Sequence, residues 1–251
     1  MTPKTAGPPG TPKDEFLRMV RRALGRDAAP PVPPYPRLED TLAGLEAEAA
    51  AVRRRVAGDH TVLLDRMARM AELGGWNVHR PANYEEALGY IGALAASLGV
   101  ERVVRTAQEV FAQVPVDAAL QDLGVSVTTV AHGEAHSRES LRQEIIAAGI
   151  GITGADYALA ETGTVVLLAR QGMGRLVSLV PPVHVALVRP QDVLETLDDF
   201  FLLRRLQYHR EGGEMGSYLN FITGPSRTAD IEQALVVGVH GPKEVHLVLL
   251  G

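Results

Sequence analysis

The stretch Phe221–Leu250, FITGPSRTADIEQALVVGVHGPKEVHLVLL, carries the pattern from which the fold can be inferred. An apolar run meets Gly224-Pro225-Ser226-Arg227, and a short helix is expected after this turn. A second apolar run ends at His240-Gly241-Pro242, and a final strand follows. Loops that leave apolar runs and are rich in glycine and small polar residues are typical of a binding site on an α/β sheet.

The chain upstream shows the same alternation of apolar runs, loops and helical segments. Gly154–Leu168 (GADYALAETGTVVLL) is a second stretch of this kind, expected opposite the first. Short apolar runs predict strands at Trp76–Arg80, Arg102–Arg105, Val125–Val130, Ile150–Thr153, Thr164–Ala169 and Val183–Val188. Helical patterns separate them at Asn83–Leu98, Ser137–Ala148 and Gln191–Leu206. Alternation of this kind predicts an α/β fold with a mostly parallel sheet flanked by helices.

The N-terminal part differs in composition, because nine of the 16 prolines fall within the first 36 residues. Pro30–Pro36 is therefore expected to be an extended linker. Asp14–Leu24 places apolar residues at helical spacing, and this helix packs either on its own domain or on a neighbouring subunit. Two longer helices are predicted at Arg37–Val56 and Thr61–Leu73, the second ended by Gly74-Gly75.

Composition excludes several classes of function. The net charge of −5 gives no reason to expect nucleic-acid binding. The chain has no cysteine, which excludes disulfides, thiolate zinc sites, a cysteine nucleophile and cysteine-ligated iron–sulfur clusters. No apolar run approaches the roughly 18 residues of a membrane span, and no signal-peptide pattern is present, so we expect a cytoplasmic protein.

Two motifs that suggest cofactors do not fit their context. Gly149–Gly154 matches GxGxxG, but the predicted helix precedes it and a strand runs through it, which is the reverse of a dinucleotide site. His132 and His136 have a spacing that suits metal ligands on a helix. Gly133 weakens that helix, and no third ligand is evident, so no metal site is predicted.

Three groups could carry chemistry, and each also has a structural interpretation. Glu161 precedes a glycine at the start of a strand, so it is either a base or nucleophile or a cap on a turn. The Gly224–Asp230 loop could cradle an anion at a helix start, although plain capping explains its Ser, Thr and Asp equally well. His240 ends an apolar strand and could be an acid, a base or an oxyanion donor, or a structural histidine.

These motifs together resemble a known family. Gly151–Thr164 (GITGADYALAETGT), Ser178–His184 (SLVPPVH) and Thr223–Pro242 (TGPSRTADIE…GVHGP) are similar to the LutC/YkgG family of lactate utilization proteins, which carry the LUD domain (formerly DUF162). The similarity runs from about Asp59 to the end of the sequence. It implies a Pro-rich arm and helical extension over residues 1–58 and a LUD domain over residues 59–251, similar to the NagB/RpiA/CoA-transferase-like superfamily.

The resemblance also implies a function. The family member would be the subunit without iron–sulfur clusters in a bacterial system that oxidises L-lactate to pyruvate, beside two companion subunits of which at least one carries clusters. A small anionic substrate or cofactor, of unknown identity, would bind in the LUD-domain cleft. The alternatives are a self-sufficient isomerase- or CoA-transferase-like enzyme that uses Glu161, and a pure scaffold.

The resemblance places site residues by motif. The catalytic candidates are Glu161 and His240. The substrate- or cofactor-binding candidates are Thr162, Gly163, Thr164, His184, Gly224, Pro225, Ser226, Arg227, Asp230 and Gly241.

Overall fold

The structure is a computed structural model that describes residues 13–26, 40–131, 137–170, 174–212, 216, 218–229 and 235–251. Residues Met1–Asp40 and Thr41–Gly251 form two separate compact units. The first unit contains helix α1 (Lys13–Ala23), and the second contains all other elements. His132, His136 and Asp230 lie outside the described residues.

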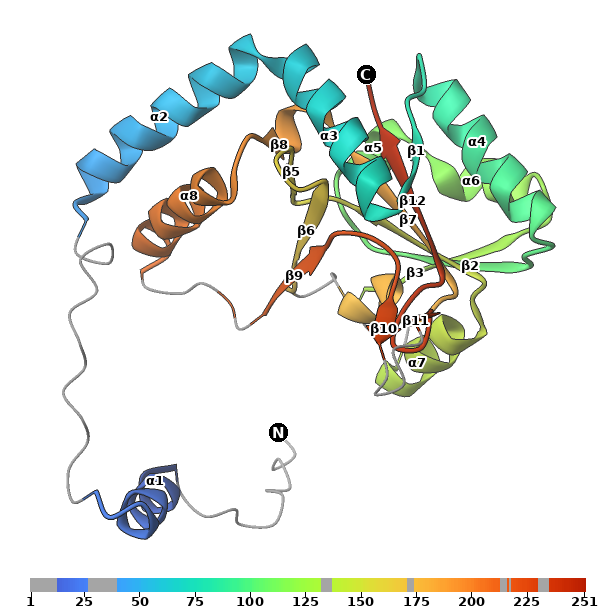
Figure 1. The fold of residues 1–251 in the computed structure, drawn as a ribbon. Coiled ribbons are helices and arrows are strands. Elements are labelled where there is room, and N and C mark those ends of the chain that lie inside the picture. The colour runs from blue at the N-terminus through green and yellow to red at the C-terminus, as the bar shows by residue number, and fades with distance from the viewer. Residues whose placement is uncertain are drawn as a thin grey trace, which may run out of the picture. The chain divides into compact units, whose positions relative to one another are not determined.

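The second unit is built around a parallel sheet, which among the described residues has six strands in the order β1-β12-β7-β4-β2-β3 (Figure 1). The strands are β1 (Asn77–His79), β2 (Arg102–Arg105), β3 (Ser126–Thr129), β4 (Ile150–Gly154), β7 (Val183–Val188) and β12 (Glu244–Leu249). Every adjacent pair is parallel. The mostly parallel sheet predicted from the sequence is thus confirmed. All residues of β4 and β7 are buried, as expected for central strands covered on both faces.

Helices cover both faces of this sheet, and alternate residues of each strand face opposite ways. In β7, Val183, Val185 and Leu187 belong to one apolar core, together with buried residues of three helices. These are α4 (Tyr84–Ser97), α5 (Val110–Gln113) and α6 (Val116–Gln121). Ala186 and Val188 belong to a second core on the other face. A third, smaller cluster contains Ile145 of α7 (Arg138–Ala147).

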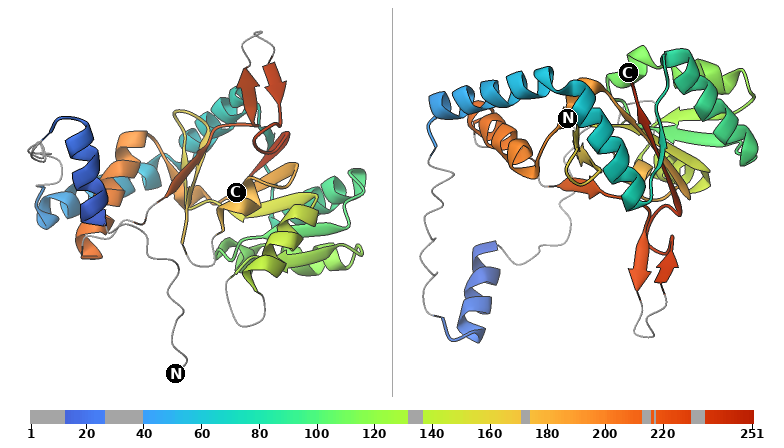
Figure 2. Two further views of the ribbon diagram at one scale, coloured as in Figure 1. Left: turned by 90° about the horizontal axis from the view of Figure 1, so that it is seen from below. Right: turned by 45° about the horizontal axis from the view of Figure 1, so that its top comes forward.

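The second core lies between the parallel sheet, a smaller sheet and three further helices (Figure 2). The helices are α2 (Leu42–Gly58), α3 (His60–Gly74) and α8 (Leu197–Arg210). The small sheet has the order β8-β5-β6-β9, with bounds β8 (Val193–Leu194), β5 (Tyr157–Leu159), β6 (Thr164–Leu168) and β9 (Leu219–Ile222). β6 is antiparallel to both β5 and β9, which sets this sheet apart from the parallel one.

Sequence signals fix where several helices begin and end. Asn83 and Ser137 accept hydrogen bonds from the third residue beyond them and so cap α4 and α7. Thr196 and Asp199 form a reciprocal capping box at the start of α8. Gly75 ends α3 in the left-handed region, with φ of 96°.

One expected helix begins later than predicted, and a second is wrong. The segment predicted as one helix from Gln191 to Leu206 contains a 3₁₀ turn, η3 (Pro190–Asp192), and strand β8 before α8 begins at Leu197. Val193-Leu194 pairs with β5, so tertiary pairing overrides the local helical pattern.

The second error concerns the segment after Gly224. A helix was expected there, but Arg227–Ala229 forms strand β10, antiparallel to β11 (Leu235–Val237). Thr228 lies opposite Val236 in this ladder, and β-branched residues favour such pairs. The hairpin projects from the body of the second unit (Figure 2), and Val236 is 46% exposed, so the strand before His240 is not buried as expected.

The boundary between domains, expected at Asp59, stays a prediction. Helix α2 packs against α8 and contributes four buried residues to the second core, so the compact unit begins at Thr41. No helix within the described ranges is long and apolar enough to cross a bilayer.

Candidate functional site

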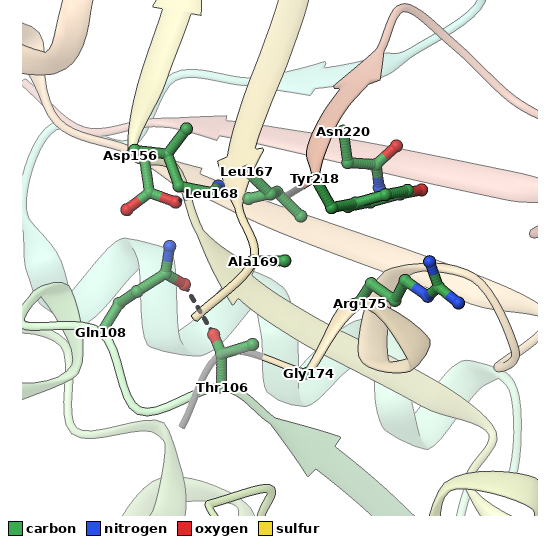
Figure 3. A pocket seen from close by; sticks show the side chains of 10 residues that line it. All are labelled: Thr106, Gln108, Asp156, Leu167, Leu168, Ala169, Gly174, Arg175, Tyr218 and Asn220. Carbon is green, nitrogen blue, oxygen red and sulfur yellow. Dashed lines mark hydrogen bonds between the residues drawn. The ribbon is translucent and has the colours of Figure 1, made fainter. Parts of the chain in front are cut away.

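The carboxyl ends of β2 and β4 form a switch point in the parallel sheet. Within this sheet, the strand that follows β2 in the chain is β3 on one side, and the strand that follows β4 is β7 on the other side, after the chain has passed through β5 and β6 of the small sheet. Ligands of open parallel sheets bind outside the carboxyl ends of strands at such points. A small pocket of about 10 Å³, which is room for about one water molecule, lies here between the parallel sheet and the small sheet and is partly open to solvent (Figure 3).

One wall of the pocket comes from the residues that follow β2. The Thr106 hydroxyl donates to the side-chain oxygen of Gln108 at 2.6 Å, and the Gly154 N–H donates to the same oxygen at 2.6 Å. Gln108 therefore ties the end of β2 to the end of β4. The two hydrogen bonds hold its side chain in a fixed position against the pocket (Figure 3).

The opposite wall carries charged and aromatic groups. The Asp156 carboxylate accepts a hydrogen bond from the Leu168 N–H at 2.7 Å and forms an ion pair with Arg170 at 2.8 Å. Only 9% of the Asp156 side chain is exposed. The Arg175 guanidinium lies 4.8 Å from the centre of the Tyr218 ring. The pocket thus combines a satisfied carboxylate with a cation held over an aromatic ring.

None of these pocket residues was among the site residues predicted from the sequence. The sequence did contain a sign of this pocket, because Thr106 and Asp156 are polar residues that closely follow the strands β2 and β4. Strand order, which the sequence alone does not reveal, is needed to see that both strand ends meet at one switch point.

Nine of the predicted site residues, all except Glu161, His184 and Asp230, belong to a different group, the loop cluster, defined here as Thr162–Thr164, Thr223–Arg227 and His240–Gly241. The Ser226 hydroxyl accepts a hydrogen bond from the His240 N–H at 3.2 Å. The Ser226 N–H donates to the Pro242 carbonyl at 3.0 Å. The two loops, which are separated in the sequence by the β10–β11 hairpin, are therefore in direct contact.

The end of α3 forms the base of the loop cluster. Arg227 donates to the Gly74 carbonyl at 3.1 Å, and a Cβ at Gly224 would overlap the same carbonyl group. A Cβ at Gly75 would meet the side chains of Arg227 and Pro225. Glycine at these positions permits a close approach of backbones. The helix-start cradle expected at Gly224–Asp230 is wrong, because β10 begins at Arg227.

A chain of threonine hydroxyls joins two segments of the loop cluster, Thr162–Thr164 and Thr223. Thr162 and Thr164 lie 2.7 Å apart, and Thr164 and Thr223 lie 2.9 Å apart, measured between hydroxyl oxygens. Gly163 has φ of 65°, and a Cβ there would overlap the backbone of α3 at Met70 and Ala71.

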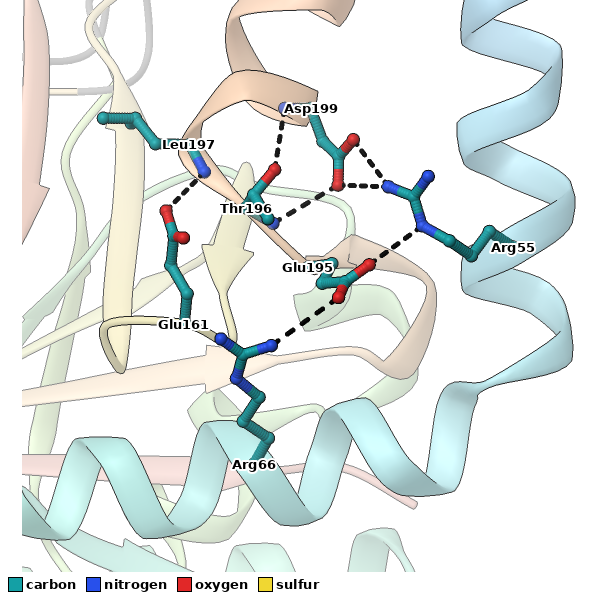
Figure 4. Close-up of polar contacts among 7 residues, drawn as sticks. All are labelled: Arg55, Arg66, Glu161, Glu195, Thr196, Leu197 and Asp199. Atoms are coloured by element: carbon teal, nitrogen blue, oxygen red, sulfur yellow. Dashed lines mark hydrogen bonds and ion pairs between the residues drawn. The ribbon is translucent and has the colours of Figure 1, made fainter.

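The carboxylate of Glu161 points to the amino end of α8 (Figure 4). It accepts a hydrogen bond from the Leu197 N–H at 2.7 Å, at the first residue of α8. A negative charge at this position complements the helix dipole. Glu161 therefore caps α8, which corresponds to the structural interpretation of this residue.

His184 lies in β7 and is fully buried. One ring nitrogen is hydrogen-bonded to the Thr153 hydroxyl at 2.9 Å, whereas Nδ1 has no partner in the described structure. Burial, together with the neighbouring His246, lowers the pKa of His184 to about 3. The Trp76 indole N–H is also buried and unpartnered, and the two ring centres lie 6.0 Å apart. Orphaned polar atoms of this kind call for a water molecule or a ligand atom.

The two candidate regions lie at opposite ends of the parallel sheet. His240–Gly241 precedes β12, and Gly75 precedes β1, so the loop cluster lies at the amino ends of these strands. The pocket lies at the carboxyl ends of β2 and β4.

Comparisons with known proteins agree with this fold. The family model described as the LUD domain matches residues 64–250. A lactate utilization protein C from Halalkalibacterium halodurans is 48% identical over 105 residues, which is 41% of this chain and 45% of that protein. The chain thus aligns with about half the length of this relative.

A longer match and a solved structure add to this similarity. A lactate utilization protein C from Bacillus pumilus is 28% identical over 247 residues, covering 94% of this chain and 96% of that protein. The crystal structure of a DUF162 family protein from Deinococcus radiodurans has a TM-score of 0.50 and 24% identity. It covers 76% of this chain and 98% of that protein, and it supports the fold alone.

Proposed function

Because the chain belongs to the LUD domain family, we propose that it is a component of a bacterial system that oxidises L-lactate to pyruvate. The match that carries this proposal extends over 96% of a Bacillus pumilus protein named lactate utilization protein C. A similarity across nearly the whole of both chains supports a shared role better than a match confined to one motif.

The proposed role is that of the subunit without iron–sulfur clusters. Oxidation of lactate to pyruvate releases two electrons, which need an acceptor. The complete absence of cysteine removes the usual ligands of iron–sulfur clusters from this chain. The electrons would pass to the two companion subunits that the family resemblance implies, at least one of which would carry iron–sulfur clusters.

The loop cluster is the proposed binding site for a small anion. Arg227 has no ion-pair partner among the described residues, and its guanidinium donates a hydrogen bond to the backbone carbonyl of Gly74. His240 is exposed beside it, and its backbone is fixed by Ser226. A guanidinium that keeps its charge and is already positioned by a hydrogen bond suits the carboxylate of a 2-hydroxy or 2-keto acid.

Growth on lactate tests the proposed role. A Bacillus pumilus strain that lacks its lactate utilization protein C is complemented with this chain and grown on L-lactate as the sole carbon source. Restored growth on lactate, with unchanged growth on glucose, is expected. If the chain is expressed and folded but growth on lactate is not restored, the proposed role is wrong.

Ligand binding tests the location of the anion site. Pyruvate is titrated into the purified full chain and into two matched variants, Arg227→Gln and Arg175→Gln. We expect Arg227→Gln to weaken binding at least tenfold, because charged hydrogen bonds contribute about 1.5–3 kcal/mol, and Arg175→Gln to leave it unchanged. The reverse pattern would place the anion in the pocket at the carboxyl ends of β2 and β4.

The alternative, a CoA-transferase-like enzyme, requires Glu161 as the nucleophile. The position of this carboxylate against the α8 N-terminus disfavours that role, because the oxygen is already used as a cap. Mass spectrometry of the chain after incubation with acetyl-CoA decides the matter. A covalent CoA thioester on Glu161 would establish the alternative.

A further inference from the structure

A groove of about 630 Å³ lies between helix α7 and the 3₁₀ turn η2 (Arg175–Ser178), beside the carboxyl end of β3. All residues that line it belong to the second unit. Two of them, Val130 and Ile145, are buried members of the third core, which also contains Val177 of η2. Both walls are therefore fixed to one packed cluster. A space of this size falls within the range of sites for organic ligands, about 300–1,000 Å³.

Helix α7 turns one mixed face toward the groove. The residues of this face recur at the spacing i, i+3, i+4, i+7 and i+8, and they are Arg138, Leu141, Arg142, Ile145 and Ile146. The two arginines lie in the first half of the helix, and Ile146, which is 57% exposed, lies at its end. This face therefore offers positive charge toward one end of the helix and apolar surface toward the other.

The opposite wall has the same combination of groups. The Arg175 guanidinium lies against the face of the Tyr218 ring, a contact that favours one position of the charge. Leu176 and Val180 line the same wall and are 39% and 41% exposed. The groove thus combines three guanidinium groups with aliphatic side chains on both walls.

The two arginines of α7 occupy positions that weaken the helix. Arg138 is its first residue, where a positive charge opposes the helix dipole. Arg142 follows one turn later, so two like charges are neighbours on one face. Neither is ion-paired within the part of the chain that the structure describes, and the nearby Glu139 accepts a hydrogen bond from Gln143 at 2.9 Å. Residues that break local rules in this way are typical of functional sites.

We propose that this groove binds a nucleotide, with the phosphate groups on the arginines and the base between the apolar walls. The three guanidinium groups and the Glu139 carboxylate together leave two positive charges, which suit a phosphate dianion better than a single carboxylate. Guanidinium groups bind phosphate oxygens through paired hydrogen bonds and keep their charge at any ordinary pH. A flat ring can contact aliphatic side chains on both walls, whereas an acyl chain in an open groove would leave much of its surface in water.

The groove is separate from the loop cluster. It lies at the carboxyl end of β3, and ligands of open parallel sheets bind at such ends. Gly174 and Arg175 line both the groove and the small pocket at the switch point, so the two spaces share a wall. The loop cluster lies at the amino ends of β1 and β12 instead. The nucleotide site is therefore a second site, beyond the proposed role in lactate oxidation.

Isothermal titration calorimetry of the full chain with ADP, without Mg²⁺, tests this proposal. We expect binding that high salt weakens. Arg138→Gln/Arg142→Gln should weaken ADP binding at least tenfold, because it removes two charged hydrogen-bond donors. The control Arg54→Gln/Arg69→Gln removes two exposed arginines of α2 and α3, which is the same change in net charge, and should bind ADP like the unchanged chain.

Two further measurements separate binding from folding and charge from apolar contact. Without ligand, Arg138→Gln/Arg142→Gln should melt at the same temperature as the unchanged chain or slightly above it, because both charges oppose the helix. Ile146→Ser removes only exposed apolar surface. It should weaken ADP binding about threefold or more and leave the binding of inorganic pyrophosphate unchanged.

Absence of ADP binding, or unchanged binding in Arg138→Gln/Arg142→Gln, would overturn the proposal. A lower melting temperature of that variant would do the same, since the arginines would then serve the fold. If pyrophosphate bound as tightly as ADP, the apolar walls would contribute nothing and the ligand would not be a nucleotide. A failure of lactate growth with this chain leaves the ADP titration unaffected, so the two proposals fail independently.

Discussion

The Ser226 hydroxyl accepts a hydrogen bond from the backbone N–H of His240 at 3.2 Å and so joins two loops separated by the β10–β11 hairpin. Ser226→Ala should destabilise the fold by about 1 kcal/mol, because a neutral hydrogen bond contributes roughly this much. Urea unfolding measures the change. Ser97→Ala removes an exposed hydroxyl that bonds only within α4, and it should cost less. Equal costs would show that the contact contributes nothing specific.

Gly163 should tolerate no side chain. Gly163→Ala forces a Cβ into the backbone of α3, so we expect a loss of about 3 kcal/mol or more, in the range of severe overpacking. Gly99→Ala is the matched control, since Gly99 has φ of 61° but no atom within 4 Å of the added Cβ. Gly99→Ala should lower the free energy of unfolding by only about 1 kcal/mol, which is the cost of a left-handed backbone conformation for alanine. Thermal unfolding of both variants compares them directly.

The ion pair between Arg55 and Asp199 joins α2 to α8. One Arg55 nitrogen lies 2.7 and 2.6 Å from the two Asp199 oxygens, and the Asp199 side chain is 9% exposed (Figure 4). The hydrogen bond to Asp199 raises the pKa of Arg55. Arg55 is 43% exposed, so solvent screening reduces the value of the pair.

We expect Asp199→Asn to lower the free energy of unfolding by about 1–2 kcal/mol, because it removes both the charge pair and part of the α8 capping box. Asp65→Asn breaks the exposed pair with Arg80, which lies at 2.6 Å, and should cost less than about 1 kcal/mol. Urea unfolding at low and high salt distinguishes the two. A larger cost for Asp65→Asn would contradict the burial argument.

His184 should make stability sensitive to acid. The unfolded chain protonates this ring below the ordinary pKa of 6.5, whereas the folded chain resists protonation until about pH 3. The unfolded state therefore binds more protons in this window, and stability falls as the pH falls. Between pH 6.5 and 5 the loss is about 2 kcal/mol.

Urea unfolding at the two pH values measures this loss. His184→Gln can keep a hydrogen bond to Thr153 and should reduce the pH dependence by that amount. An unaltered slope in His184→Gln would mean that another group carries the acid sensitivity.

The variant Glu161→Gln distinguishes a capping role of Glu161 at α8 from a role as a reacting group. The glutamine oxygen can still accept from the Leu197 N–H, so only the charge at the helix N-terminus is lost, at a cost below about 1 kcal/mol. Growth on lactate should be unaffected. Loss of growth without loss of stability would instead identify Glu161 as a reacting group.

Local patterns were sufficient to predict much of the fold. The strands Arg102–Arg105 and Val183–Val188 have the predicted bounds, because each is a short apolar run with clear borders. Helix α3 ends at the left-handed Gly75, and helix α4 begins after the Asn83 cap, both as expected. Capping residues and short strand runs act over a few neighbouring residues, so they can be recognised in a single sequence.

Long-range pairing was not predictable in the same way. Val193-Leu194 continued a helical pattern but pairs with β5, and Arg227–Ala229 forms a strand because β11 lies beside it. The pocket was missed for a similar reason, since Thr106 and Asp156 become neighbours only through the strand order. The contacts of the loop cluster agree with the grouping by motif, while its function stays a prediction.

The position of β12 has a consequence for folding during synthesis. β12 lies between β1 and β7, and Asn77 pairs with His246 across more than half of the sequence. A nascent chain that has reached β11 therefore holds two strands with open edges that cannot yet be joined. Contacts of such long range slow folding, and open edges invite association with other chains. The ribosome must release Glu244–Leu249 before the sheet can close, so chaperone demand should be greatest while this strand is still inside the exit tunnel.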